Sequence, residues 1–436
     1  MITIIKQNKH IYLSVILILA LISVSIVSSS LFTIIALALA VVGITFFRPS
    51  EAIVVLFALM PFANIFKLSP ESMSLFTVLE LFALLVFVFK CPKMKVTAFV
   101  SVSVLLVYIF LLSMNNLQIL TIIKVIVGFM LIYFATIYIK KDDVRNIAYL
   151  LTISIAAMLL LCQHPGYFKY VEKYLSDLNY YVDSSGQVTE MLRNSGFLGD
   201  PNYCAVLIIV ALSLLCVLYY YKHIGVEFWI FSAILIPLGF LTYSKSYFLC
   251  IAMLVVLLIV FVLFPKHKGW AIISIISLGV VLSLSFSGKI EVLNMILLRF
   301  GENSDFTTGR GTLNQQYLSY IFENTKVLLL GEGICVDRYV GAHNNVHNIY
   351  IELFFKMGII GSIIYLIILV SVFNKMSAVK SQKRKFVEYM PALFIAVMFG
   401  FLAGVLNYAT PFYLIIAYVA FNYNSIPMRE EVDMRS

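Results

Sequence analysis

Apolar stretches long enough to cross a bilayer follow one another along this chain, and their succession limits the fold more than any other feature. A transmembrane helix needs about 20 predominantly apolar residues. Only 12% of the residues are charged and 62% are hydrophobic, which is far from the balance of a soluble domain. The runs are continuous and lack the two-residue alternation of barrel strands. We therefore predict an all-α polytopic membrane protein.

Hydropathy predicts about 14 transmembrane helices. The third is short and contains Pro61, so we expect it to be broken or re-entrant. The first resembles a signal peptide, but no A-x-A site follows it, and we interpret it as an uncleaved anchor. The predicted spans lie near 11–27, 31–47, 51–66, 72–89, 97–114, 117–139, 145–162, 202–221, 226–242, 247–264, 270–287, 348–373, 386–404 and 407–424.

The distribution of basic residues predicts the orientation of these helices. With both termini cytoplasmic, most of the 31 lysines and arginines fall in inner loops, and the short outer loops hold only Lys67 and Lys245. The net charge of +9 is then an orientation signal, and we expect no nucleic-acid partner. The chain divides into an N-terminal transmembrane bundle (1–162), a first outer loop (163–201), further transmembrane helices (202–287), a large outer loop (288–347) and C-terminal transmembrane helices (348–436).

Three basic residues at the outer face predict an anion site. Arg193 lies in the first long loop, Lys245 in a very short outer turn, and Arg310 at the start of an amphipathic helix in the second long loop. Arginine is unfavourable at the positive end of a helix unless an anion binds there, and its fork suits phosphate. The alternatives are a snorkelling role for Lys245 and helix capping for the nearby Asp200 and Asn202.

The sequence contains no DxD pair, P-loop or GxGxxG motif, and its six cysteines show no metal-ligand spacing. We expect neither a metal nor a cofactor. A synthetic enzyme at the outer face has no ATP, so its donor must carry an activated leaving group such as a lipid diphosphate. Positive side chains would neutralise that group as it leaves.

His347 is the candidate general base. It lies at the start of an apolar helix, whose positive end disfavours the imidazolium and keeps the ring neutral. The other interpretation is a structural histidine at a membrane interface. We treat Glu352 and Lys356 as a structural i,i+4 pair, and Glu80 and Lys124 as structural or as walls of a groove.

Several of these residues form a recognisable combination. The run HN-x-Y-I-E followed by G-x-x-G, from His347 to Gly361, resembles the signature of the bacterial O-antigen polymerase and O-antigen ligase superfamily. The segments R-x-x-G-F-x-x-D-P-N (193–202) and G-R with a later G-E-G (309–333) resemble that family's outer loops. Together the motifs cover about residues 190–365.

The resemblance implies a helical fold similar to that of glycosyltransferases of the C type. It also implies a metal-independent polysaccharide polymerase in the bacterial inner membrane. The donor would be an undecaprenyl-diphosphate-linked oligosaccharide, and a chain-length regulator protein and membrane lipid are expected partners. The roles carried over are His347 as base, Arg310 as diphosphate ligand, and Arg193, Lys245, Asn348 and Glu332 as substrate-binding residues. Lys245 stands where relatives often carry arginine, so it keeps the charge and loses the bidentate fork.

Other functions are compatible with the same pattern. An O-antigen ligase, which transfers the finished glycan to lipid A-core, needs the same donor site. A lipid-linked oligosaccharide flippase would predict internal repeats and charge at the midplane, and the sequence shows neither feature. A scaffold or sensor protein would leave Arg310 and His347 replaceable.

Overall fold

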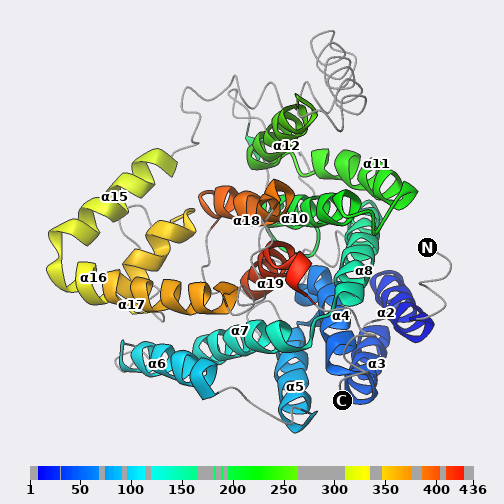
Figure 1. Cartoon of the computed structure of the whole chain (residues 1–436), viewed down its shortest axis with the longest axis horizontal. Helices are drawn as coiled ribbons and strands as arrows, with labels where there is room; N and C mark the ends of the chain where they lie inside the picture. The colour runs from blue at the N-terminus through cyan, green and yellow to red at the C-terminus, as the bar shows by residue number, and fades with distance from the viewer. Residues whose placement is uncertain are drawn as a thin grey trace.

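A computed structural model of the chain gives the fold (Figure 1). The structure describes residues 8–29, 31–67, 74–90, 96–112, 119–164, 181–182, 188–189, 195–263, 310–333, 346–374, 385–402 and 409–426. Within these ranges the regular secondary structure is helical, apart from one two-residue strand pair, β1 (Tyr181–Val182) with β2 (Val188–Thr189). The predicted all-α class is confirmed for the described residues.

The helices of the first part of the chain follow the predicted spans closely. They are α2 (Lys9–Val27), α3 (Leu31–Phe46), α4 (Pro49–Leu59), the 3-10 segment η1 (Met60–Phe66), α5 (Leu75–Lys90), α6 (Val96–Leu112), α7 (Ile119–Tyr138) and α8 (Lys141–Leu161).

The second part of the chain contains both bundle helices and a shorter pair. They are α10 (Pro201–Tyr220), α11 (Val226–Phe240), α12 (Lys245–Leu263), α15 (Arg310–Glu323), α16 (Thr325–Leu330), α17 (Ile349–Asn374), α18 (Phe386–Phe399), α19 (Thr410–Phe421) and η2 (Tyr423–Ser425). The predicted span at 270–287 lies outside the described residues.

Five segments are long and apolar enough to cross a membrane, judged by length and composition. They are Lys9–Val27, Pro49–Phe66, Lys141–Leu161, Pro201–Tyr220 and Ile349–Val370. Seven shorter apolar helices accompany them in the described part of the chain. This is compatible with a polytopic membrane protein, while the number of spans stays a prediction.

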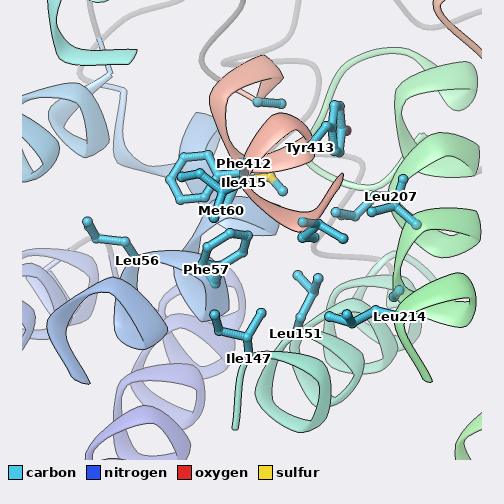
Figure 2. Packing of buried hydrophobic residues seen from close by; sticks show 14 of the residues in the cluster. Leu56, Phe57, Met60, Ile147, Leu151, Leu207, Leu214, Phe412, Tyr413 and Ile415 are labelled. Carbon is cyan, nitrogen blue, oxygen red and sulfur yellow. The ribbon is translucent and has the colours of Figure 1, made fainter. Parts of the chain in front are cut away.

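The centre of the bundle is formed by α4, α8, α10 and α19. Figure 2 shows their side chains meeting: Phe57 and Met60 from α4 and η1, Leu151 from α8, Leu207 from α10, and Phe412 from α19. All residues of α4 after Pro49 are buried, as expected for a helix that is apolar on every side. In contrast, α3 and α6 leave rows of apolar side chains exposed, which is the surface that lipid covers in a membrane protein.

The predicted break in the third span is confirmed. α4 ends at Leu59, and the chain continues as the 3-10 segment η1, whose second residue is Pro61. Proline has no N–H to donate to the preceding turn and its ring clashes with the carbonyl there, so the α-helix ends just before it. Ser74 then donates a hydrogen bond to the carbonyl of Ala63, which fixes the start of α5 against η1.

α17 is broken at Gly358, a feature that the apolar pattern did not predict. Gly358 has φ 60°, inside a helix that otherwise runs from Ile349 to Asn374. The residues that follow α16 form hydrogen bonds with α17 just before this break. The N–H groups of Glu332 and Gly333 donate to the carbonyls of Phe355 (2.8 Å) and Lys356 (3.0 Å), respectively. Figure 1 shows α17 as two pieces beside α16, in gold and orange.

A Cβ atom on Gly358 would lie 2.5 Å from the backbone of Leu329, so only glycine fits this approach. α15, α16 and the first half of α17 form a small core of their own, which we call the outer cap after the predicted outer loop that carries α15 and α16. Its buried residues are Tyr317, Ile321, Val327, Val346, Ile351 and Phe355.

Candidate functional site

The candidate site is built where four helices begin and one ends. α10, α12, α15 and α17 start there, and α18 finishes there with Phe401 just beyond it. These ends are joined by hydrogen bonds and by the electrostatic influence of a few charged side chains.

Asp200 starts α10, as the predicted capping role requires. Its Oδ1 accepts a hydrogen bond from the backbone N–H of Asn202 at 2.7 Å, and Pro201 occupies the first helical turn. Before it, Gly196 and Gly199 have φ of 59° and 82°, which turns the loop sharply into the helix. The second carboxylate oxygen of Asp200 is not used by this cap.

Lys245 starts α12, directly beside the start of α10. The hydroxyl of Ser244 donates a hydrogen bond to Oδ1 of Asn202 at 2.8 Å, and both residues are buried. The short turn that carries these residues includes Tyr243 with φ 46°, a strained conformation for a residue with a Cβ. The turn therefore holds Lys245 next to the Asp200 cap.

Arg310 is the first residue of α15 and reaches across to the end of α18. Its Nη1 donates a hydrogen bond to the carbonyl of Phe401 at 3.4 Å. Burial lowers the pKa of the guanidinium, and the carboxylate of Asp200 acts in the opposite direction. The group stays protonated at neutral pH, because arginine titrates far above it. A partly buried positive charge thus lies near Asp200.

His347 lies two residues before the start of α17, in the segment 346–348. Burial lowers the pKa of its imidazole below the ordinary value of 6.5, and the positive charge of Arg310 lowers it further. The charges of Asp200 and Glu352 oppose these effects. The neutral form of the ring is therefore favoured at pH 7, with burial as the largest cause and the charge of Arg310 as the next.

The other residues assigned from the sequence fall into two groups. Asn348 caps α17, because its Oδ1 accepts from the N–H groups of Tyr350 (3.0 Å) and Ile351 (3.3 Å). The carboxylate of Glu332 accepts a hydrogen bond from the Tyr320 hydroxyl inside the outer cap. Asn348 and Glu332 therefore each form hydrogen bonds within the protein, in addition to the substrate-binding roles expected from the sequence. Arg193 lies outside the described residues.

The predicted pair of Glu352 and Lys356 is also found. Nζ of Lys356 lies 2.7 Å from Oε1 of Glu352, which confirms the i,i+4 pair. Lys124 is an electrostatic neighbour of the buried Glu80. Lys67 adds a second positive charge beside Lys124.

Asp200 is the residue whose electrostatic role sequence reasoning missed. The D-P-N motif indicated a helix cap, and the cap is present. Yet the same carboxylate raises the pKa of both Arg310 and His347, which lie far along the chain. No local sequence pattern indicates this electrostatic influence, because it depends on how α10, α15 and α17 pack.

Chemically, the arrangement combines a fixed positive charge, a carboxylate and a neutral imidazole at one end of a helical bundle. Within the part of the chain that the structure describes, no three His, Cys, Asp or Glu side chains are grouped to hold a metal ion. The positive charge can bind an anion, and the neutral imidazole can accept a proton.

Comparison of the chain with protein-family models, with curated proteins and with solved structures finds no match. The resemblance to the polymerase and ligase superfamily therefore stands on the motif residues alone.

Proposed function

We propose that this protein is a polysaccharide polymerase of the bacterial plasma membrane, acting at its outer face with both termini in the cytoplasm. It transfers a growing glycan from undecaprenyl diphosphate to a lipid-linked repeat unit of O-antigen or capsule. Support comes from the apolar helices and from the motifs that carry the family resemblance.

One observation carries the proposal. Arg310 and His347, singled out as anion ligand and base, are electrostatic neighbours and share Asp200. The two residues come from different helices and have no sequence relation that would bring them together. A scaffold protein would need no neutral imidazole beside a partly buried arginine.

Arg310 binds the donor diphosphate in this proposal. Its guanidinium stands at the first residue of α15, where the free N–H groups of the helix add positive potential. Lys245, at the start of α12, supplies a second charge from the turn beside Asp200. Arg193 is assigned to the same donor. These charges stabilise the diphosphate as it leaves, without a metal.

His347 accepts the proton of the reaction. An acceptor hydroxyl attacks the anomeric carbon of the donor sugar, and a new carbon–oxygen glycosidic bond forms. The bond from that carbon to the diphosphate oxygen breaks, and the electron pair leaves with the lipid diphosphate. The hydroxyl proton passes to the neutral ring of His347. Asp200 is a positioning residue that acts through the charges of Arg310 and His347.

Donor binding strengthens this base. Because Arg310 lowers the pKa of His347, a diphosphate that neutralises Arg310 raises it again. The imidazole then accepts a proton more readily in the complex than in the free enzyme. The site therefore favours proton removal after the donor has bound.

Deletion of the gene followed by gel analysis of surface polysaccharide tests the function. A polymerase predicts products with a single repeat unit. Unattached full-length polymer would indicate the ligase reaction, which uses the same donor site. Lipid-linked repeats retained on the cytoplasmic side would indicate a flippase, and an unchanged polysaccharide would contradict all three.

A further inference from the structure

The outer cap carries exposed apolar side chains that its own core does not use. Phe322 on α15 is 67% exposed, and Leu329 on α16 is 44% exposed. Leu318 and Leu330 are exposed as well. The core of the cap is formed by other residues of these helices, including Tyr317, Ile321 and Val327.

The apolar end of α16 is continuous with two membrane-type helices. The hydroxyl of Tyr108 on α6 donates to the carbonyls of Leu330 (3.1 Å) and Met357 (2.9 Å). Gly358 of α17 packs on the backbone of Leu329. The end of α16 therefore lies at the junction of α6 and α17.

Both neighbouring helices present apolar side chains outward at this junction. Val107 and Leu111 of α6 are exposed, as are Ile360 and Ile363 of α17, just beyond the break. An apolar surface that continues across three helices, two of them of membrane type, fits lipid better than water. Polar exposed residues such as Gln316 and Glu323 give α15 a second, water-compatible side.

We propose that α16 and the end of α15 lie in the interfacial layer of the membrane, with Phe322, Leu329 and Leu330 in contact with lipid. The part of α17 that crosses the bilayer then begins at Gly358. The segment Ile349–Met357 belongs to the outer cap, although hydropathy joins it to the span.

This placement has a consequence that rests on the proposed function. α15 has 14 residues and is about 20 Å long at about 1.5 Å per residue. Anchoring its far end in lipid keeps Arg310 within that distance of the headgroup layer. A lipid-linked diphosphate lies at headgroup depth, so the distance that the donor must rise to reach Arg310 is limited to about the length of α15.

Tryptophan quenching by brominated lipids tests the proposal in the full-length protein. The two native tryptophans are replaced (Trp229→Phe, Trp270→Phe), and a single tryptophan is introduced in each variant. The variants are then reconstituted in proteoliposomes. Phe322→Trp is the test variant. Gln316→Trp on another side of the same helix is its matched control, and Ile363→Trp on α17 is the reference for lipid contact.

We expect bromines near the headgroup to quench Phe322→Trp roughly twofold or more beyond Gln316→Trp, and deep bromines to quench it less than shallow ones. The proposal is overturned if the tryptophan of Phe322→Trp is quenched no more than that of Gln316→Trp. It is also overturned if the tryptophan of Ile363→Trp is not quenched at all. Polysaccharide synthesis is recorded separately, so a failure of the enzymatic assignment leaves this result interpretable.

Discussion

Two opposite charges flank the imidazole of His347, and each can be removed singly. Arg310 lowers the pKa of His347 and Asp200 raises it, on top of the lowering by burial. In Arg310→Gln the pKa should therefore rise toward the ordinary value of 6.5, and in Asp200→Asn it should fall further.

Histidine-selective NMR titration of the purified protein measures both changes. The signal is assigned by its loss in His347→Gln among the six histidines. Lys222→Gln, at the other end of α10, is a control that should leave the titration unchanged. An unaltered titration in both Arg310→Gln and Asp200→Asn would show that the three side chains are not neighbours.

In the proposed reaction, the lowered pKa of His347 also sets the acid limit. The base must be neutral, so the rate should hold as the pH falls through 6.5 and decline only below it. In the unfolded chain the same histidine takes up its proton first, near pH 6.5. His347 should therefore destabilise the fold progressively as the pH falls from about 6.5 to its folded pKa.

A pH–rate profile together with thermal unfolding of wild type and His347→Gln checks these expectations. The variant should lose less stability than wild type on acidification. Activity that halves at or above pH 6.5 would contradict the assignment of a lowered pKa to the base.

At the scale of elements, the contact between α16 and the break in α17 depends on two glycines. Gly331 has φ 81° and Gly358 has φ 60°, and a Cβ on either would lie 2.5 Å from backbone atoms of the other segment. Gly358→Ala should therefore destabilise the protein by on the order of 3 kcal/mol, through backbone strain and separation of the two segments.

Gly43→Ala is the matched control, because Gly43 lies within α3 and the atoms nearest to its new Cβ would belong to the side chain of Phe47 and not to the backbone. Its effect should stay within about 1 kcal/mol. Thermal unfolding in detergent gives both values. Equal stabilities of the two variants would mean that the segments do not pack closely at Gly358.

Elements with local signals were predicted from the sequence. Proline ended α4, Asp200 capped α10, and the apolar spacing of Tyr317 and Ile321 produced the amphipathic α15. The break at Gly358 was not predicted, because a glycine within a long, mainly apolar run does not by itself mark a break. What determines it is the approach of Leu329 and Gly331 from another segment.

The candidate site was predicted in part for the same reason. Arg310 and His347 stood out as charged or titratable residues in an apolar chain, whereas the role of Asp200 required the packed bundle. Asn348 and Glu332 were assigned as ligands from the family resemblance. In the fold, the oxygen atoms of both accept hydrogen bonds within the protein.

At the scale of the whole molecule, hydrogen bonds divide the helix ends into two groups. The start of α10 is joined to the turn before α12 through Asn202 and Ser244. At the opposite end, Glu388 of α18 accepts hydrogen bonds from the Tyr221 hydroxyl and from Nδ2 of Asn424, at 2.7 Å in the second case. This grouping agrees with helices that cross a layer in alternating directions.

The two ends should therefore face opposite sides of the membrane. In a background without the six native cysteines, Gln163→Cys, beyond α8, should react with an impermeant maleimide in intact cells. Val226→Cys, at the start of α11, is 70% exposed and should react only after permeabilisation. Labelling of both from the same side would contradict the proposed topology.

The central claim is that Arg310 and His347 act together in glycan transfer, and reconstituted synthesis tests it most directly. Purified protein in proteoliposomes receives undecaprenyl-diphosphate-linked repeat units, and product length is followed on gels. Wild type and Lys222→Ala should build long chains, while His347→Ala and Arg310→Gln should each slow the reaction by about 100-fold or more. Long chains formed at the normal rate by His347→Ala would contradict the account.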